Sequence, residues 1–428
     1  MNDVRVLRIR LGSTLVGYVT HYRDGKSLFV FDESYVALGP ARPILSLSFT
    51  VPGNEEATEQ KLRQNYSTMI KLPTYFSNLL PEGPLRKYVV KKMQIHHDHE
   101  FDILAALGDN LPGAVIAEPA AEIPEAARRV RPNARISEAS SKPLPFSLAG
   151  AQLKFSMIEH GGRFSLTDGA GEWIIKPPHP TFPNVPANEF AMMKLAEAAG
   201  VTIPEVRLVE IDDLDLGDLA ELSIPRGEHW AYAIKRYDRT PEGRLHAEDF
   251  AQVFGLYGDR EYDGTNYDSI GKLIFNVFPD PHNQLEQFVR RLVVNILVGN
   301  SDAHLKNWSV LYQDGIRPKL APAYDIVSTI QYVSKNVSIA LNLGKEKEFY
   351  VVAPEHFERL ARRIGVSAEF ILEVVRSTVA STGEAWGTLL SALPVSGDLR
   401  GALRQHWDRL HTLLRPSALL ASTAGTRS

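Results

Sequence analysis

Three short polar side chains in the C-terminal half of the chain, Asp302, Asn307 and Asp325, have the types and spacing needed to work on a phosphate group. An aspartate can orient and deprotonate an attacking hydroxyl. An asparagine and a second aspartate can hold a divalent metal ion against phosphate oxygens. Because all three side chains are short, the backbone must bring them together, and a tight loop between apolar elements would do so. The group therefore predicts a site for phosphoryl chemistry.

The spacing of Asp302 and Asn307, with four residues between them, is that of a protein-kinase catalytic loop. The spacing alone is weak support, since a polar loop capped by Asp and Asn has the same pattern. The flanking residues favour catalysis. Residues 288–299 form an apolar helical pattern, and residues 308–325 predict a hairpin that ends at Asp325. Helix, polar loop, hairpin and aspartate follow in the order that a kinase-like C-terminal lobe requires.

A phosphate-binding half of the site is expected upstream. Residues 147–154 form a small-residue turn that ends in Lys154, and small residues let backbone N–H groups approach phosphate oxygens. Lys176 ends a predicted strand and is placed to bind the α- and β-phosphates. The alternatives are an ordinary turn and an edge lysine. Glu189, near the start of an amphipathic helix, either pairs with Lys176 or complements the helix dipole.

Four further residues are candidates for this site. Residues 230–238 predict the last strand of the lobe and a hinge, where Lys235 and Tyr237 would border the adenine. Lys306 and His304 lie inside the catalytic loop. We expect Lys306 to neutralise charge on the transferred phosphoryl group, and His304 to support the loop beside the nucleotide.

The composition is that of an ordinary globular protein. The chain has 428 residues, of which 44% are hydrophobic and 23% charged, so it is long enough for several subdomains. A net charge of −4 argues against the whole chain being an electrostatic nucleic-acid binder. The absence of cysteine excludes disulfides, thiolate nucleophiles and Cys-ligated zinc. The first residues lack a signal-peptide core and no long apolar run occurs, so we expect a cytoplasmic protein with no membrane contact.

Changes in composition divide the chain into five expected segments. These are an N-terminal α+β subdomain (1–113), a proline-rich linker (114–146), a strand-rich lobe with the phosphate loop (147–240), a helical lobe with the catalytic loop (241–415) and a flexible tail (416–428). The expected fold class is α+β: a two-lobed protein-kinase-like fold with an added N-terminal subdomain and a mostly helical C-terminal lobe.

Seven motifs are spread along nearly the whole chain. They are Phe76-x-Asn-Leu-Leu-Pro-Glu-Gly83, Ser147-x-Ala-Gly-Ala-Gln-x-Lys154, a strand lysine before proline at Lys176, Asn188-Glu-Phe190, His246-Ala-Glu-Asp-Phe250, Asn300-Ser-Asp-Ala-His-x-Lys-Asn307 and Pro322-x-Tyr-Asp325. They resemble the motifs of the HipA family of bacterial serine/threonine kinase toxins, and they come in that family's order. One departure is Leu153, which stands where the family's pattern has an acidic residue.

The resemblance implies a role for each site residue. Asp302 would be the catalytic base, and Asn307 and Asp325 would bind Mg²⁺. The phosphates of ATP would be held by Lys176 and by the loop residues Ala149, Gly150, Ala151, Gln152 and Lys154. Ser147 would be autophosphorylated, and in the family this modification ejects the phosphate loop and switches the kinase off. A dianionic phosphate there would repel the phosphates of the nucleotide.

The function expected from the resemblance is that of an ATP- and Mg²⁺-dependent serine/threonine protein kinase, the toxin of a HipA/HipB-type toxin–antitoxin module. Its partners would be a HipB-like DNA-binding antitoxin and, through that complex, operator DNA. Its substrate would be a translation component such as an aminoacyl-tRNA synthetase, whose phosphorylation leads to growth arrest and persistence. The alternatives are a kinase-like corepressor that acts mainly through the antitoxin, and a small-molecule or lipid kinase. The intact Asp302, Asn307, Asp325 and Lys176 favour the active protein kinase.

Overall fold

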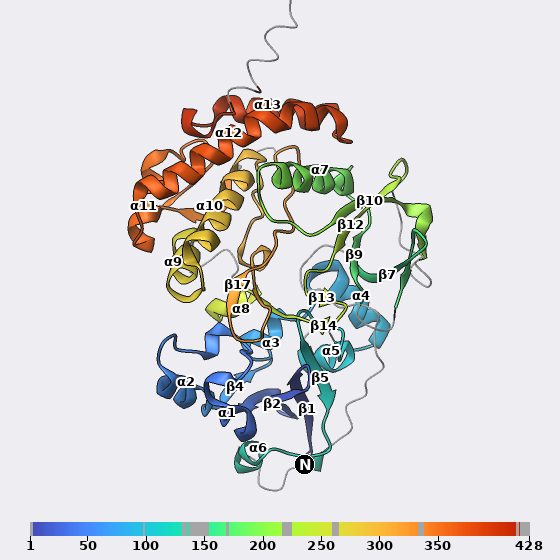
Figure 1. Cartoon of the computed structure of the whole chain (residues 1–428). Helices are drawn as coiled ribbons and strands as arrows, with labels where there is room; N and C mark the ends of the chain where they lie inside the picture. The colour runs from blue at the N-terminus through green and yellow to red at the C-terminus, as the bar shows by residue number, and fades with distance from the viewer. Residues whose placement is uncertain are drawn as a thin grey trace, which may run out of the picture.

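The computed structural model of the chain describes residues 3–96, 99–130, 135–136, 154–167, 171–215, 225–258, 265–332, 338–416 and 419. Three regions follow one another in sequence and in space (Figure 1). An N-terminal sheet with short helices lies at one end of the molecule, a second sheet lies beside its centre, and long helices cover the other end. This is the α+β arrangement that the sequence predicted.

The N-terminal region is built on a six-stranded sheet in which β4, β3, β2, β1 and β5 lie side by side and β6 pairs with β1. Its strands are β1 (Asp3–Leu11), β2 (Thr14–Tyr22), β3 (Lys26–Phe31), β4 (Tyr66–Met69), β5 (Val115–Pro119) and β6 (Arg135–Ile136). Its helices are α1 (Glu33–Val36), α2 (Glu55–Leu62), α3 (Thr74–Asn78), α4 (Gly83–Met93), α5 (Glu100–Leu107) and α6 (Glu125–Val130), with 3-10 turns at Gly39–Ala41 and Leu47–Phe49.

Both faces of this sheet are buried, as the alternation of β1 shows. Val4 and Val6 belong to one apolar cluster, whereas Leu7 and Ile9 belong to another on the opposite face. Successive side chains of a strand point to opposite faces, so one strand can supply two cores. The cluster around Val4 and Val6 is completed by α6 through the buried Ala127.

The prediction of a linker over residues 114–146 is wrong for its first residues. Residues 115–119 form β5, which pairs antiparallel with β1, and α6 packs on the same sheet. Prolines at positions 119 and 124 suggested an extended segment, but Pro119 is the last residue of β5 and Pro124 precedes α6. Proline is tolerated at strand ends and at helix starts, so its density alone does not mark a linker. The N-terminal subdomain extends beyond position 113 to α6.

In the second sheet, the strands lie side by side in the order β10-β12-β9-β7-β8-β11. Its strands are β7 (Phe155–His160), β8 (Arg163–Leu166), β9 (Trp173–Lys176), β10 (Val206–Glu210), β11 (Leu214–Asp215) and β12 (Trp230–Lys235), with a 3-10 turn at Ile211–Asp213. One helix, α7 (Val185–Ala198), connects β9 to β10 and packs between this sheet and α12 (Figure 1). Apolar residues of the sheet such as Phe155 and Trp173 share a core with the N-terminal region.

The third region is mostly helical, as expected. It contains β13 (Arg239–Thr240), β14 (Gly243–Arg244), β15 (His246–Asp249), α8 (Phe250–Phe254), α9 (Tyr267–Val277), α10 (Pro281–Leu297), β16 (Ser309–Tyr312), β17 (Pro318–Leu320), β18 (Ser338–Leu343), β19 (Glu346–Glu348), α11 (Pro354–Ile364), α12 (Ala368–Ala392) and α13 (Gly397–Arg409), with 3-10 turns at Leu305–Asn307 and Thr412–Leu414. Among the described residues, no helix is long and apolar enough to cross a bilayer.

The elements around the predicted catalytic loop follow the expected order. The buried helix α10 ends at Leu297, the loop follows, and β16 and β17 form the antiparallel hairpin that leads to Asp325. The hairpin also pairs with β15, which runs into α8. Most of α10 is buried, because its apolar side chains pack against α9 and α12. A rigid helix and a small sheet therefore hold the two ends of the loop.

Candidate functional site

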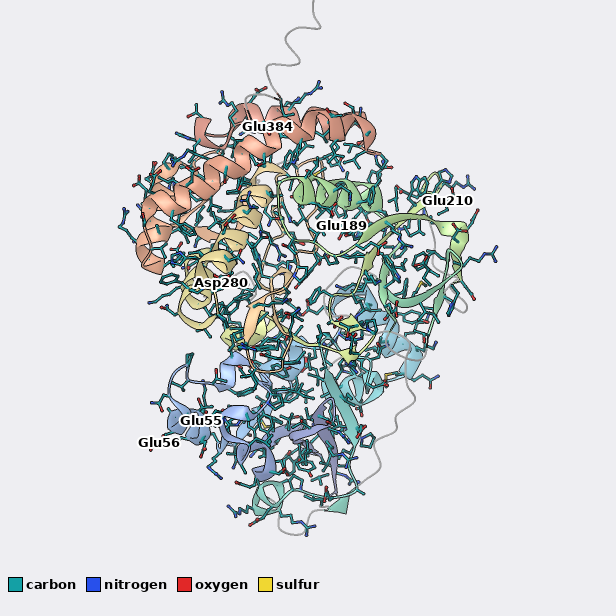
Figure 2. All side chains as sticks on the ribbon, viewed as in Figure 1. Glu55, Glu56, Glu189, Glu210, Asp280 and Glu384 are labelled. Carbon is teal, nitrogen blue, oxygen red and sulfur yellow. The ribbon has the colours of Figure 1, made fainter. Side chains whose placement is uncertain are left out.

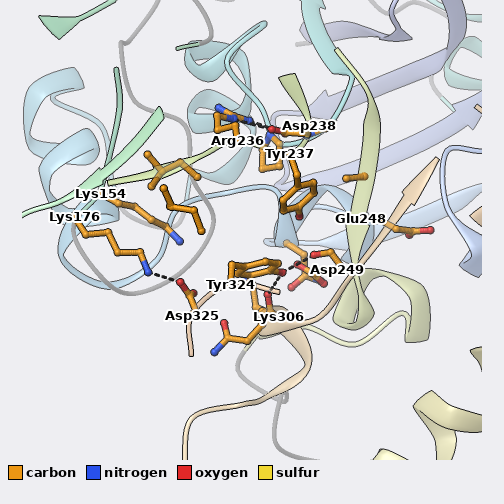
Figure 3. A pocket seen from close by; sticks show the side chains of 18 of the residues that line it. Lys154, Lys176, Arg236, Tyr237, Asp238, Glu248, Asp249, Lys306, Tyr324 and Asp325 are labelled. Atoms are coloured by element: carbon orange, nitrogen blue, oxygen red, sulfur yellow. Dashed lines mark hydrogen bonds and ion pairs between the residues drawn. The ribbon is translucent and has the colours of Figure 1, made fainter. Parts of the chain in front are cut away.

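A pocket of about 220 Å³ opens where the second sheet, the predicted catalytic loop and the N-terminal region meet (Figure 3). The predicted site residues that the structure describes all line it: Lys154, Lys176, Lys235, Tyr237, Asp302, His304, Lys306, Asn307 and Asp325. Ser147, Ala149, Gly150, Ala151 and Gln152 lie outside the described residues. The fold thus brings together side chains that are more than a hundred residues apart in sequence.

Lys176 is the centre of a buried ion-pair cluster in this pocket. Its Nζ lies 2.6 Å from Oε1 of Glu189 and also pairs with Oδ1 of Asp325. The side chains of Lys176 and Glu189 are only 4% and 2% exposed. Figure 2 shows Glu189 in the interior, whereas Glu55 and Glu56 project from the surface. Of the two alternatives left open for Glu189, the structure supports the pair with Lys176. Since α7 begins at Val185, Glu189 lies too far along the helix to serve mainly its dipole.

The cluster keeps Asp325 ionised. Burial alone would raise the pKa of Asp325, but the ammonium groups of Lys176 and Lys154 outweigh it and hold that pKa well below its usual range. Burial, reinforced by the nearby Lys176, lowers the pKa of Lys154 to about 8. Two lysines and one carboxylate therefore converge at the same wall of the pocket (Figure 3). This is a suitable environment for a phosphate chain and its counterion.

The loop predicted to be catalytic is held by side-chain amides. Asn300 donates through Nδ2 to the backbone oxygen of Asp325 at 3.2 Å and accepts through Oδ1 from the backbone N–H of Asp302 at 3.0 Å. Asn307 donates through Nδ2 to the backbone oxygen of Asp302 at 2.6 Å. Because this bond uses the amide nitrogen, it turns the amide oxygen of Asn307 to the other side, as a metal ligand would require. The side chain of Asp302 is 54% exposed and accessible to a substrate.

His304 supports the loop from within. Its Nδ1 accepts from the backbone N–H of Lys306 at 3.2 Å, which assigns the ring proton of the neutral imidazole to Nε2. Nε2 lies 3.8 Å from Oδ1 of Asp302. Burial lowers the pKa of His304, so the neutral ring prevails at pH 7. The neutral ring thus lies beside Asp302 without placing a positive charge next to its carboxylate.

Lys235 is the last residue of β12, and Tyr237 follows it where the sequence predicts a hinge. Tyr237 stacks on Tyr324 with ring centroids 5.9 Å apart, and Lys235 lies over the ring of Trp173 at 6.0 Å. The next residues form a buried ion pair that sequence reasoning missed: Arg236 donates to both carboxylate oxygens of Asp238 at 2.8 Å. An Arg-x-Asp at the end of a buried strand was the signal that could have revealed it.

Arg291 on α10 is a second residue that sequence reasoning missed. Its Nη2 donates to the backbone oxygens of Asn307 and Tyr324, and its guanidinium lies 4.2 Å from the centroid of Trp308. One buried cation thereby fixes the backbone of one candidate metal ligand and of the residue before the other. An arginine inside the apolar pattern of residues 288–299 was the visible signal, because a buried charge needs partners.

The residues present fit a magnesium ion. The described residues contain no group of three or more His, Cys, Asp or Glu side chains that could hold a metal by itself. Mg²⁺ is commonly bound by one or two protein oxygens together with phosphate oxygens and water. The carboxylate of Asp325 and the amide oxygen of Asn307 match that need, and both line the pocket beside Lys154 and Lys176.

Comparison with known proteins identifies the family of the chain. Residues 146–386 match the family model described as the HipA-like C-terminal domain, and residues 7–118 match the HipA N-terminal domain. A protein of Sinorhizobium fredii, named "Putative kinase Y4dM", is 38% identical and covers 95% of this chain and 97% of its own. The serine/threonine-protein kinase toxin HipA of Shewanella oneidensis is 25% identical over 65% of this chain and 68% of its own.

A solved structure shows the same fold. It is the complex of HipA, HipB and operator DNA from Shewanella oneidensis, which matches 98% of this chain and 99% of its own with a TM-score of 0.69 and 19% sequence identity. The fold and the site define a protein of the two-lobed kinase-like class with an added N-terminal domain. The chain belongs to the HipA family, as the family models show over both of its domains. The resemblance expected from the sequence is confirmed.

Proposed function

We propose that this protein is an ATP- and Mg²⁺-dependent serine/threonine protein kinase and the toxin of a HipA/HipB-type module. The observation that carries the proposal is the convergence of Lys176, Glu189 and Asp325 with Asp302 and Asn307 around one pocket. Phosphoryl transfer is catalysed mainly by positioning and by stabilising charge, and these five residues supply both. The names of relatives support the same class of activity.

Each residue has a defined task in this proposal. Lys176 and Lys154 bind phosphate oxygens, and Glu189 holds the Lys176 ammonium in place. Asp325 and Asn307 hold the metal ion, which when bound neutralises charge on the phosphates. Asp302 orients the acceptor hydroxyl and takes its proton, so that the oxygen can attack the γ-phosphorus as the bond to the β-phosphate breaks. Exposure of Asp302 suits this task, because a protein substrate must reach it.

The proposal extends to the biological setting. We infer a HipB-like DNA-binding antitoxin as partner, and operator DNA through that complex, because the structurally similar HipA was solved with both. The substrate would be a translation component such as an aminoacyl-tRNA synthetase. Autophosphorylation at Ser147, just before the phosphate loop, would switch the kinase off. The negative charge added there opposes the phosphates of the nucleotide.

A labelling experiment tests this function. Purified protein is incubated with γ-labelled ATP, Mg²⁺ and a lysate of the host, and the labelled acceptor is identified by mass spectrometry with its phosphorylated residue. We expect one main protein acceptor phosphorylated on serine or threonine, together with labelling of the enzyme itself. Transfer to a lipid or a small molecule with no labelled protein would overturn the proposal in favour of another kinase class. Labelling that persists when EDTA removes Mg²⁺ would contradict the proposed metal dependence.

A further inference from the structure

The N-terminal region reaches into the pocket through the turn between α3 and α4. Glu82 is the residue before α4, and its Oε1 accepts from Nζ of Lys306 in the catalytic loop at 2.5 Å. These two residues are 224 positions apart in sequence. The Lys306 side chain is 4% exposed and that of Glu82 is 31% exposed. Because one partner is almost fully buried, this ion pair is screened far less than a surface pair.

Gly258, from a third segment of the chain, packs closely against this ion pair. A Cβ built on Gly258, which follows α8, would overlap Oε1 of Glu82 and lie 3.4 Å from Nζ of Lys306. Any other residue at position 258 would force the Glu82 carboxylate to shift from its present place beside Lys306. Only glycine at position 258 therefore leaves room for the carboxylate of Glu82 and the ammonium group of Lys306 to meet.

The turn that carries Glu82 is itself anchored to the catalytic region. Asn78 donates through Nδ2 to the backbone oxygen of Leu256 at 2.7 Å, and Gln252 donates to the backbone oxygen of Tyr75 at 3.1 Å. Asn78, Glu82 and Gln252 all line the same pocket as the phosphate-binding lysines. The N-terminal region is thus one wall of the pocket rather than a separate attachment.

Opposing charges act on the ammonium group of Lys306. Glu82 and the buried Asp249 attract its ammonium group, while Lys154 repels it across the pocket. The backbone of Lys306 is fixed as well, since its N–H donates to His304 and its carbonyl accepts from the hydroxyl of Tyr324 at 2.9 Å. The long side chain of Lys306 is therefore the part that can still move, and the carboxylate of Glu82 restricts it.

We propose that Glu82 is a positioning residue of the active site, through which the N-terminal region holds the Lys306 ammonium where the phosphoryl group is transferred. The inference rests on the proposed kinase function for its catalytic consequence. Without Glu82, the ammonium group would sample other rotamers, and the γ-phosphoryl group would meet it less often in the reacting geometry. Binding of the α- and β-phosphates by Lys176 would be unaffected, because Lys176 is held by Glu189 and Asp325.

A double-mutant cycle tests this coupling in the full-length protein. We expect Glu82→Gln to lower kcat for autophosphorylation by about 10-fold or more, with KM for ATP changed by less than about 3-fold. In a Lys306→Met background, Glu82→Gln should have no further effect, because its target is gone. Gly258→Ala, which displaces the same carboxylate sterically, should reproduce the loss of kcat. Glu82→Asp, which keeps the charge on a shorter stem, should recover part of it.

The matched control is Glu100→Gln. Glu100 is another buried glutamate of the N-terminal region, and it accepts from the backbone N–H of Leu72 at 2.8 Å and from Ser77 at 3.0 Å, away from Lys306. It should lower thermal stability while leaving kcat unchanged. If Glu82→Gln and Lys306→Met are additive, or if Glu100→Gln lowers kcat equally, Glu82 has only a structural role and the inference is overturned.

A second measurement does not depend on catalysis. Lys306 is labelled with an amine-reactive ester and the rate of its modification is followed by mass spectrometry. We expect the rate in Glu82→Gln to rise about 10-fold over wild type, because the ammonium group loses its partner and becomes accessible, while Glu100→Gln labels as wild type does. Equal rates in wild type and Glu82→Gln would overturn the inference even if the protein has no kinase activity. If the labelling rates show the coupling between Glu82 and Lys306 but the wild-type protein transfers no phosphoryl group, the proposed function is refuted and the ion-pair contact is not.

Discussion

Replacing Arg291 with methionine should separate catalysis from stability. Arg291 is 2% exposed and donates to the backbone oxygens of Asn307 and Tyr324, so it fixes the approach of both candidate metal ligands. Methionine has a similar length and fills the same space, but it cannot donate to either oxygen. The change therefore removes the two hydrogen bonds while most of the packing remains.

The expected loss of stability is small because opposing effects nearly cancel. Two hydrogen bonds from a charged donor contribute about 1.5–3 kcal/mol each. Against this, burial lowers the pKa of Arg291 to about 10, and its Nε and Nη1 have no partner within the described part of the chain. Replacing such a buried charge with an apolar side chain is often close to neutral. We expect the free energy of unfolding to fall by no more than about 2 kcal/mol.

The expected loss of activity is large. Misplacement of reacting groups by about 1 Å costs about 100-fold in rate. We therefore expect Arg291→Met to lower kcat for autophosphorylation by about 100-fold and to raise the Mg²⁺ concentration for half-maximal activity. Urea denaturation and a Mg²⁺ titration of the rate measure the two effects separately.

The neighbouring Arg290 provides the control. It lies on the same helix but bonds Glu286 at 2.7 Å and the backbone oxygen of Ala199 at 3.2 Å, away from the loop. Arg290→Met should change stability without changing the Mg²⁺ requirement. The reasoning is refuted if Arg291→Met retains activity within about 3-fold of wild type, or if both variants lose activity in proportion to their lost stability.

Three further outcomes are expected. Asp325→Ala should abolish the Mg²⁺ dependence of ATP binding measured by calorimetry, because the metal loses its carboxylate; unchanged dependence contradicts the assignment of Asp325. Ser147→Ala should bind ATP and carry no inhibitory phosphate, whereas wild type phosphorylated at Ser147 should bind a non-hydrolysable ATP analogue weakly; equal affinity, or a phosphate found by mass spectrometry only elsewhere, rules out this switch. The pKa of Lys154, about 8, lies below its ordinary value, so the cation is present below that pH and lost above it. It is about nine-tenths charged at pH 7 and about one-tenth charged at pH 9. Affinity for the nucleotide should therefore fall over this interval in wild type and stay flat in Lys154→Met, and parallel profiles contradict the role of Lys154.

The sequence was sufficient for the parts of the site that short segments determine. Asp302 and Asn307 share one loop, and the apolar pattern of α10 and the hairpin of β16 and β17 place that loop and Asp325. The pairing of Lys176 with Glu189 was one of two open alternatives, and the structure decides it. Such features depend on local periodicity and turn chemistry, which are visible in a single sequence.

The parts that the sequence did not reveal depend on contacts between distant segments. Glu82 lies in the Phe76–Gly83 motif that carries part of the family resemblance, yet its partner Lys306 is 224 residues away. Arg291 resembles any helical arginine until the carbonyl groups of Asn307 and Tyr324 are placed against it. Proline density at the end of the N-terminal subdomain concealed β5, because the pairing of residues 115–119 with β1 is also a long-range property. Tertiary contacts of this kind leave no periodic signal.

Asp302 is the proposed catalytic base of the phosphoryl-transfer site, and one measurement tests this role most directly. Wild type and Asp302→Ala are compared for incorporation of label from γ-labelled ATP and, in the same samples, for affinity toward the nucleotide. Because Asp302 acts on the acceptor hydroxyl and not on the nucleotide, we expect transfer to fall by about 10³-fold or more while the Kd for Mg²⁺–ATP stays within about 3-fold of wild type. Near-normal transfer by a folded Asp302→Ala protein would show that the base lies elsewhere.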